Sequence, residues 1–312
     1  GLVERARFSF APMGLSTRWL SNKSIDSRNC YVLLKRGYAI PKEEFFEDAR
    51  PLRALSERDR GGITMTPEAG RLHANVAALD FDSQYPNIIV RNNLSYESPS
   101  GGGGLGVLPE VVGPWVERRL RLKKLKKTLQ AGTRERLYCE QRVDALKMIL
   151  VTLYGVSGCC RNRFGNVVAF EEINRRSREC MLKAKAAAES RRFHIVYSNV
   201  DSLFVVREGA SGADYEALAA EIAAATGMPM SMDKHFRFIA FLPLKGDPSS
   251  SALNHYFGLT REGKVEARGI ELRRSDTPEF VRAFQEGLIR VVLDRGDAEA
   301  VLTEGVSEGL AL

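Results

Sequence analysis

Two aspartates that lie far apart in the sequence share one kind of setting, the end of a short apolar run. Asp80 ends such a run, and a turn that contains Pro86 is expected to follow it. Asp201 lies between the β-branched segments His194–Tyr197 and Leu203–Val206, which predict two strands joined by a polar turn. Two carboxylates on rigid strands could hold a pair of Mg²⁺ ions about 3.5–4 Å apart, as two-metal phosphoryl transfer requires. An ordinary turn role for each acid is the alternative, because Asp is common in turns.

Cationic side chains between the two aspartates could bind a polyphosphate. The segment Glu117–Lys127 is expected to belong to a helix that Pro114 opens, with a thin apolar side and a strongly basic remainder. Arg119 and Lys123 are four residues apart, so a helix places them on one face, where both could grip the same phosphates. A solvated basic surface is the alternative for a charge run of this kind.

A second helix is predicted from about Arg134 to Tyr154, turned back on the first helix and ended by Gly155. Lys147, Val151 and Tyr154 fall at i, i+4 and i+7 and therefore share a face. Together with the two cations of the first helix, Lys147 would form a cationic pocket for a triphosphate. The ring of Tyr154 could pack against a base or against its neighbours, and the spacing favours its neighbours.

The elements that must position these residues alternate between strands and helices. Their order predicts an α+β fold, in which a sheet domain carries a helical insertion. The glycine-rich segment Ser98–Gly106 is expected to be a flexible linker, since no GK[ST] sequence follows it as a phosphate-binding loop requires. The other predicted elements are strands at Tyr31–Leu34, Phe236–Leu244 and Gly263–Leu272, and helices at Ala169–Arg191, Asp214–Thr226 (with Asp214 as N-cap) and Thr277–Leu293.

Composition and length narrow the class of protein. The chain has 312 residues with 44% hydrophobic content, enough for a sizeable core divided over two or more domains. A formal charge of +7 favours a polyanionic partner, nucleic acid first. Five cysteines without a C-x-x-C pair indicate neither a zinc site nor a disulfide framework. With no run of 18 apolar residues and no signal-peptide core, we expect a cytoplasmic, nucleoid-associated protein without a membrane partner.

Three motifs, in order along the chain, resemble those of the family-B DNA polymerases and look most like a divergent archaeal branch. Asp80–Ile89 resembles the palm motif DxxSLYPSII, and Tyr197–Ser202 resembles the palm motif YGDTDS. Lys147–Gly155 resembles the fingers motif KxxxNSxYG, and Arg119–Lys123 resembles the RxxxK helix that grips phosphates. The resemblance therefore spans nearly the whole chain.

The resemblance implies a role for each matching residue. Asp80 and Asp201 would hold two Mg²⁺ or Mn²⁺ ions, with the backbone of Phe81 as a further ligand. Tyr85 would stack under the sugar and exclude a 2′-hydroxyl, and Lys147 would protonate the leaving pyrophosphate. The other residues implied to touch nucleotide or DNA are Ser83 and Gln84 through backbone N–H groups, Arg119, Lys123 and Lys147 on the triphosphate, Val151 and Tyr154 beside the nascent base pair, and Tyr256 on DNA.

The resemblance also implies a domain plan and partners. A palm with an antiparallel sheet would carry an inserted two-helix fingers hairpin and a truncated helical thumb. The expected parts are 1–72 (an N-terminal region packing on the palm), 73–112 (palm), 113–157 (fingers), 158–275 (palm) and 276–312 (start of the thumb). A proofreading exonuclease domain would be missing. Primer–template DNA and dNTPs would be the ligands, and a separate polypeptide could supply the exonuclease or complete the thumb.

Three departures from the motifs leave the function open. Asn199 replaces the first acid of YGDTDS, Val151 replaces the Asn of the fingers motif, and Leu253–Tyr256 stands where the family has KKxY. A weak, distributive DNA-templated DNA polymerase is the leading hypothesis. A catalytically inactive DNA-binding or scaffold subunit is the second, and a two-metal nuclease the third, although the cationic helices have no obvious role in a nuclease. We expect slow extension that needs Asp201 and improves in Asn199→Asp.

Overall fold

The computed structural model describes residues 1–42, 53, 61–67, 72–159, 161–244, 246–247 and 250–295. The chain forms two compact units, and each unit is assembled from two separate segments of sequence. The first unit comprises Gly1–Gly61 and Asp82–Glu179, and the second comprises Gly62–Phe81 and Cys180–Leu312. The division into five parts drawn from the sequence stays a prediction, and residues 296–312 of its last part lie outside the described residues.

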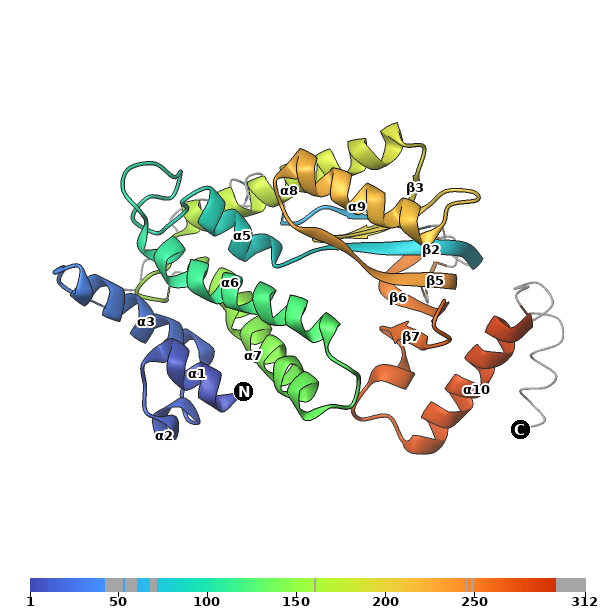
Figure 1. Cartoon of the computed structure of the whole chain (residues 1–312), viewed down its shortest axis with the longest axis horizontal. Helices are drawn as coiled ribbons and strands as arrows, with labels where there is room; N and C mark the ends of the chain where they lie inside the picture. Colours follow the sequence, from blue (N-terminus) through green and yellow to red (C-terminus); the bar gives the residue numbers. More distant parts are fainter. Residues whose placement is uncertain are drawn as a thin grey trace. The chain divides into compact units, whose positions relative to one another are not determined.

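An antiparallel sheet forms the core of the second unit (Figure 1). Within the described residues it has seven strands in the order β1-β3-β4-β2-β5-β6-β7, and each neighbouring pair is antiparallel. The mixed helix and antiparallel-sheet class predicted from the sequence is therefore confirmed. The strands are β1 (Thr64–Met65), β2 (Leu72–Phe81), β3 (His194–Asn199), β4 (Ser202–Val206), β5 (Met230–Pro243), β6 (Ser251–Thr260) and β7 (Val265–Arg268).

Both faces of this sheet are covered where β2 crosses it. The β2 residues from Val76 to Leu79 are all buried, which explains a continuous apolar run instead of an alternating one. Val76 and Ala78 belong to a cluster rich in aromatic side chains. The opposite face is covered by α9 (Gly212–Thr226) and the C-terminal part of α8 (Val167–Ser190), as Figure 1 shows. The aromatic members of the cluster are Tyr197, Phe204, Phe236, Phe241 and Tyr256.

One prediction for the second unit needs correction, and one strand was missed. Helix α9 begins at Gly212 with Ser211 as its N-cap, so the prediction of Asp214 as the cap was wrong. Asp214 instead completes a capping box, in which its carboxylate accepts the Ser211 N–H at 2.8 Å and Ser211 Oγ accepts the Asp214 N–H at 3.3 Å. Strand β6 was not predicted, because Asn254 and His255 interrupt its apolar pattern. The unit ends, among described residues, with the 3₁₀ turn η1 (Glu271–Arg273) and helix α10 (Glu279–Arg295).

The described part of the first unit is built from helices (Figure 1). The strand predicted at Tyr31–Leu34 was wrong, because these residues belong to α3. Ile25, Asn29 and Val32 are buried at helical spacing, so the apolar stripe of a longer window decides the structure. Its helices are α1 (Leu2–Ser9), α2 (Met13–Ser16), α3 (Ser21–Lys35), α5 (Gln84–Arg91), α6 (Val107–Thr128), α7 (Arg134–Ser157) and α8 as far as Glu179.

Helices α6 and α7 are longer than predicted, and both helix boundaries set by a breaker residue were wrong. Pro114 lies inside α6, and Gly155 lies inside α7. Buried apolar residues from Val107 to Val112 extend α6 towards its N-terminus, so packing offsets the one backbone hydrogen bond that Pro114 removes. The loop 129–133 joins the two helices, which pack against each other. No helix in the described part of the chain is long and apolar enough to span a bilayer.

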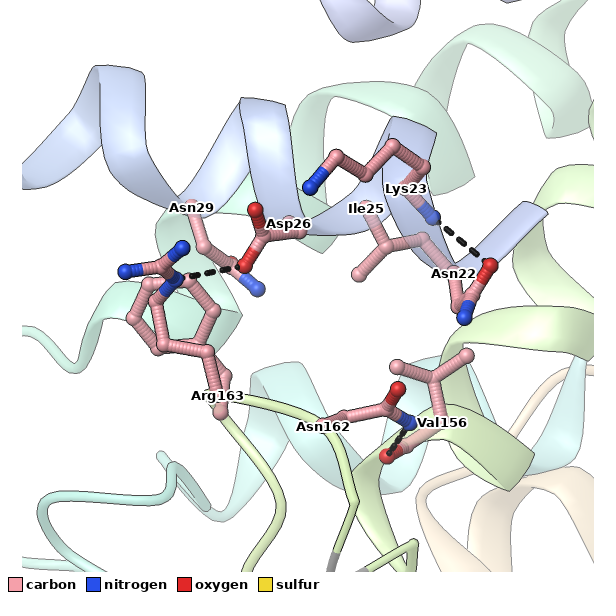
Figure 2. Close-up of a pocket in the computed structure, with 9 residues that line it drawn as sticks. Asn22, Lys23, Ile25, Asp26, Asn29, Val156, Asn162 and Arg163 are labelled. Carbon is pink, nitrogen blue, oxygen red and sulfur yellow. Dashed lines mark hydrogen bonds and ion pairs between the residues drawn. The ribbon is translucent and has the colours of Figure 1, made fainter. Parts of the chain in front are cut away.

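Polar contacts attach α3 to the end of α7. Figure 2 shows a small cavity there, with Arg163 Nε donating to Asp26 Oδ1 at 2.9 Å. Figure 2 also shows Asn162 Nδ2 donating to the carbonyl of Val156, at 3.0 Å. The first contact attaches the loop after α7 to α3, and the second attaches the loop to α7 itself. We assign the cavity to packing.

Candidate active site

The second unit brings the two predicted carboxylate residues to neighbouring strands. Asp80 is near the end of β2, where it lies opposite Ser202 of β4 and Ser231 of β5. Asp201 directly precedes Ser202, in the turn between β3 and β4. The Phe81 N–H donates to the carbonyl of Asp201 at 2.9 Å, so the two acidic segments are joined through their backbones. Residues directly opposite in a sheet have Cβ atoms about 4.5–5.5 Å apart, so the small serines leave room around Asp80.

The turn that carries Asp201 is held from two sides. Val200 has φ 47°, which is rare for a β-branched residue and marks local strain. Its N–H donates to the carbonyl of Ile63 at 3.0 Å, next to β1. A Cβ on Gly62 would lie 2.9 Å from the Val200 side chain, so a glycine is needed for this approach. The surrounding strands therefore impose the conformation of the turn before Asp201.

These residues fit a pair of hard divalent cations by the chemistry of their donors. The two carboxylates and the carbonyl of Phe81 are oxygen ligands, which Mg²⁺ and Mn²⁺ prefer. No group of three or more His, Cys, Asp or Glu side chains able to hold a metal occurs in the ranges that the structure describes. Phosphate oxygens and water would therefore have to complete the coordination, as is usual for Mg²⁺.

The first unit holds the residues predicted to bind the triphosphate. Ser83, the N-cap of α5, has φ 58° and does not cap the helix with its side chain. Instead Ser83 Oγ accepts a hydrogen bond from Arg119 of α6. Lys123, one turn further along α6, forms an ion pair with Asp82. The N-terminal end of a helix carries unpaired N–H groups and partial positive charge, so Arg119 and Lys123 beside it favour an anion.

The segment after Asp80 also corrects a prediction. We expected a Pro-containing turn there, and the structure has helix α5 instead. Pro86 occupies the first turn of α5, where its missing N–H costs no hydrogen bond within the helix. The side chain of Gln84 is buried and accepts a hydrogen bond from Ser177 Oγ at 2.9 Å. Gln84 therefore attaches α5 to α8 through its side chain.

Three aromatic rings stack in the first unit. Tyr85 and Tyr154 are parallel, with ring centroids 4.0 Å apart and an interplanar angle of 1°. Tyr154 also stacks on Phe170 at 4.7 Å, and its hydroxyl donates to Asn174 Oδ1. Phe170 packs so closely on Gly158 that a Cβ there would lie 2.6 Å from its ring. The packing of Tyr154 against neighbours, which the spacing favoured, is thus observed.

The two remaining residues predicted on α7 have a different environment. Lys147 is exposed, and Val151 has 61% of its surface exposed. Both precede Tyr154 on the same helix, so this face of α7 combines a solvated cation, an exposed apolar residue and a half-buried ring. The nucleotide-binding roles of Lys147 and Val151 stay predictions.

The YGDTDS-like segment and the segment in place of KKxY meet in the second unit. Asn199 Nδ2 donates to Asn254 Oδ1 at 2.9 Å, and the Tyr197 hydroxyl donates to the same oxygen at 3.1 Å. Burial raises the pKa of the Tyr197 hydroxyl, which therefore stays protonated as a donor. Tyr256 is 6% exposed, with its ring between Phe204 and Phe241. Its packing explains an aromatic residue at this position, and its DNA contact stays a prediction.

Sequence reasoning missed several residues that contact the predicted set, and four of them are instructive. Asp82 had a detectable signal, since it is a second acid two residues after Asp80. Phe170 and Asn174 fall on one face of a predicted helix, but nothing in the sequence indicates what that face contacts. In the sequence Asn254 stood out only because it replaces a lysine of the KKxY motif. Its contact with Asn199 depends on the path of β6 in the folded sheet.

Comparisons with known proteins show what the chain is similar to. The family model described as DNA polymerase family B matches residues 23–100 and 104–310. A DNA polymerase of Archaeoglobus fulgidus is 27% identical over 263 residues, which cover 80% of this chain and 32% of the relative. DNA polymerase 2 of Saccharolobus solfataricus is 26% identical over 306 residues, covering 93% of this chain and 44% of the relative. DNA polymerase 1 of Aeropyrum pernix is 29% identical over 266 residues, covering 78% of this chain and 27% of the relative.

A solved structure has the same fold. The family B DNA polymerase of the hyperthermophilic archaeon Pyrobaculum calidifontis superimposes with a TM-score of 0.69 at 22% sequence identity. The match covers 98% of this chain and 40% of that structure. This chain thus spans less than half the length of each of these relatives.

Proposed function

Because the chain belongs to DNA polymerase family B, we propose that it is a DNA-templated DNA polymerase that transfers a nucleotide from a dNTP to a primer 3′-hydroxyl. The register of β2 and β4 is the observation that carries the proposal, because it aligns Asp80 with the residue that follows Asp201. Two scattered acids have no structural need to end on neighbouring strands. A two-metal site needs that arrangement.

In this proposal the second unit supplies the metal ligands. The carboxylates of Asp80 and Asp201, with the carbonyl of Phe81, would hold two divalent cations. When bound, such cations neutralise the phosphates and lower the pKa of the attacking hydroxyl. The residues directly opposite Asp80 on the two neighbouring strands, Ser202 and Ser231, are small and uncharged.

The first unit would bind the nucleotide. The N-terminal end of α5 and the side chains of Arg119 and Lys123 would neutralise the triphosphate, whose charge shifts towards the leaving pyrophosphate during the reaction. Lys123 pairs with Asp82 in the structure, so phosphate has to compete with that carboxylate for the ammonium group. Lys147 is exposed on α7 and would donate a proton to the pyrophosphate.

An inactive DNA-binding subunit is the second candidate function. The observation that favours it is the exposed apolar side chain of Val151, at the position where the resembled motif has an amide. Asn199, which stands in place of an acid near Asp201, favours it too. Both hypotheses predict binding to primer–template DNA, and only polymerase activity separates them.

Primer extension by Asp201→Asn tests the proposed activity. Asparagine keeps the size of the side chain and removes the charge that holds the cations, so extension should fall at least about a hundredfold. The assay would use a labelled primer–template, four dNTPs and Mg²⁺ or Mn²⁺ at low salt. Asp233→Asn is the matched control, because Asp233 is exposed on β5 and should tolerate the same change.

Two results would contradict the polymerase hypothesis. One is the absence of extension by the pure, folded chain in Mn²⁺ at low salt, with DNA binding retained. The other is extension that survives in Asp201→Asn, which would point to a contaminating enzyme or to a different site.

A further inference from the structure

The contact between Asn199 and Asn254 joins strands that are not neighbours in the sheet. Asn199 ends β3 and Asn254 lies in β6, and three strands separate β3 from β6 in the hydrogen-bonded order. In a flat sheet the two strands would be roughly 19 Å apart, at about 4.8 Å for each step. Their side chains nevertheless share a hydrogen bond of 2.9 Å, so the sheet is strongly curled.

Irregular pairing explains how the sheet reaches this curl. The register shifts between Ala78 and Leu79 of β2 and at two places along β5, and bulges of this kind bend a strand. The contact is also specific, because Asn254 has φ 60°, a left-handed conformation that asparagine adopts more readily than most residues. Asn254 Oδ1 accepts from both Asn199 and Tyr197, so its side chain is fixed.

The two partners are also two of the departures from the resembled motifs. Asn199 stands where YGDTDS has its first acid, and Asn254 stands where KKxY has its second lysine. An acid and a base in these positions could pair as ions, whereas here two neutral amides share a hydrogen bond. The two departures therefore remove one negative and one positive charge from a single contact.

We propose that Asn254 is a positioning residue for Asp201. We also propose that Asn199 and Asn254 are a compensated replacement, in which the loss of an acid at residue 199 is balanced by the loss of a base at residue 254. This inference rests on the proposed function, because it assigns Asn254 a part in holding a metal ligand. Asn254 fixes the Asn199 side chain, and Asn199 begins the strained turn that leads through Val200 to Asp201. The Asn199 carbonyl accepts the Asp201 N–H at 2.5 Å, so a shift of Asn199 moves Asp201 directly.

This coupling reverses the expectation drawn from the sequence for Asn199→Asp. A carboxylate at residue 199 would add a negative charge near Asp80 and Asp201 with no cation at residue 254 to balance it. Asn254→Lys alone would instead direct an ammonium donor at the amide donor of Asn199. Each single change should therefore be harmful, and the double change should restore a matched acid and base.

A thermal double-mutant cycle without metal tests the coupling independently of activity. The unfolding midpoints of the wild type, Asn199→Asp, Asn254→Lys and the double variant are compared. We expect each single variant to melt several degrees lower and the double variant to recover part of the loss, since the effects of residues in contact are not additive. The recovery should be incomplete, because a lysine at residue 254 cannot accept from the Tyr197 hydroxyl and is strained at φ 60°. Asn22→Asp is the control for the same charge change at an exposed position. If the change in unfolding midpoint of the double variant equals the sum of the two single changes, Asn199 and Asn254 are not coupled and the proposed compensation is wrong.

Mn²⁺ binding, followed by electron paramagnetic resonance, tests the positioning role without turnover. Asn254→Gly removes the amide and keeps the left-handed backbone available, so strain is not added. Residues that orient metal ligands typically change metal affinity 10- to 100-fold, and we expect the Mn²⁺ dissociation constant of Asn254→Gly to rise about tenfold. Asn254→Asp keeps an acceptor for Asn199 and should retain most of the affinity.

The outcomes distinguish the inference from the proposed function. A lower melting temperature in Asn254→Gly with unchanged Mn²⁺ affinity would show that Asn254 is structural only, and would overturn the positioning role. A wild type that binds no Mn²⁺ would overturn it as well. Coupling in the thermal cycle with normal Mn²⁺ binding but no primer extension would leave the inference standing and reject the polymerase activity.

Discussion

At the scale of single residues, the stacked rings of Tyr85 and Tyr154 are the most closely defined feature of the predicted nucleotide site. Tyr85 is parallel to Tyr154, and Tyr154 is fixed from its other side by Phe170 and through its hydroxyl by Asn174. Each aromatic pair contributes about 0.5–1.5 kcal/mol beyond the area it buries. The Tyr85 ring therefore has a defined position, which a steric role in sugar selection requires.

Tyr85→Ala should increase the use of ribonucleotides. Removing the ring opens the space that a 2′-hydroxyl would occupy, so the ratio of rNTP to dNTP incorporation should rise at least about tenfold, or about 1.4 kcal/mol in discrimination. The measurement is single-nucleotide extension with matched rNTP and dNTP. Tyr38→Ala is the control, because Tyr38 is exposed on the same unit. An unchanged ratio in a folded variant would leave Tyr85 with a packing role alone.

At the scale of secondary-structure elements, packing sets the extent of one helix and local capping sets the start of another. Helix α6 continues through Pro114 because burial of its valines stabilises the helix on both sides of the proline. Helix α9, in contrast, begins where its capping box can form. Ser211 and Asp214 satisfy two backbone donors reciprocally, and Gly227 ends the helix with φ 69°. Since α9 covers the face of the sheet opposite the aromatic cluster, its start affects the stability of the second unit.

Ser211→Ala should lower the free energy of unfolding by about 1 kcal/mol, the usual cost of losing an N-cap. Urea unfolding followed by circular dichroism measures the change. Ser190→Ala is the matched control, because Ser190 is exposed in the last turn of α8, where its hydroxyl donates to the carbonyl of Ala187.

The destabilisation by Ser211→Ala should also depend on pH. Hydrogen bonds from the Ser211 side chain, then from its backbone, hold the pKa of Asp214 below its usual range, with a further contribution from Arg207. A carboxyl group with a lowered pKa stabilises the fold above its unfolded-state pKa of about 3.9, and that stability is lost as the pH falls through the folded-state value. The difference in the free energy of unfolding between wild type and Ser211→Ala should therefore become smaller as the pH falls. A difference that grows in acid would contradict the capping box.

At the scale of the whole molecule, charge and the lost lysines together determine how the chain would hold DNA. The formal charge of +7 favours a polyanion, but Leu253 and Asn254 stand where the KKxY motif has two cations. The side chain of Asn254 accepts a hydrogen bond from Asn199, whereas the side chain of Leu253 is 46% exposed. A cation at Leu253 would therefore leave the hydrogen bond between Asn199 and Asn254 in place.

Leu253→Lys should strengthen binding to primer–template DNA and make it more sensitive to salt. Each phosphate contact changes the slope of log K against log salt by about −0.9, so one new contact should steepen the slope by that amount. Fluorescence anisotropy of a labelled primer–template over a salt series measures both quantities. Leu182→Lys is the control, since Leu182 is an exposed residue of α8 and gives the same added charge. Equal slopes for the two variants would show that Leu253 does not approach the phosphates.

The candidate site was predictable from the sequence as far as it depends on short spacings. Asp80 and Asp201 could be picked out because each is next to an apolar run. The shared face of Arg119 and Lys123 could be predicted because residues four apart lie one helical turn apart, which is a local property of the sequence. The α+β class was likewise predictable from apolar runs rich in β-branched and aromatic residues, whereas the antiparallel sheet was implied by the resemblance to the family-B DNA polymerases.

Only the tertiary structure decided which residues from separate elements meet. The pairing of Lys123 with Asp82 and the stack of Tyr85 on Tyr154 join distant segments of the chain, and no pattern within either segment encodes its partner. The contact between Asn199 and Asn254 depends on bulges that bend β2 and β5. Bulges change the direction of a strand without changing its composition, so the sequence showed two separate losses where the folded chain has one paired contact.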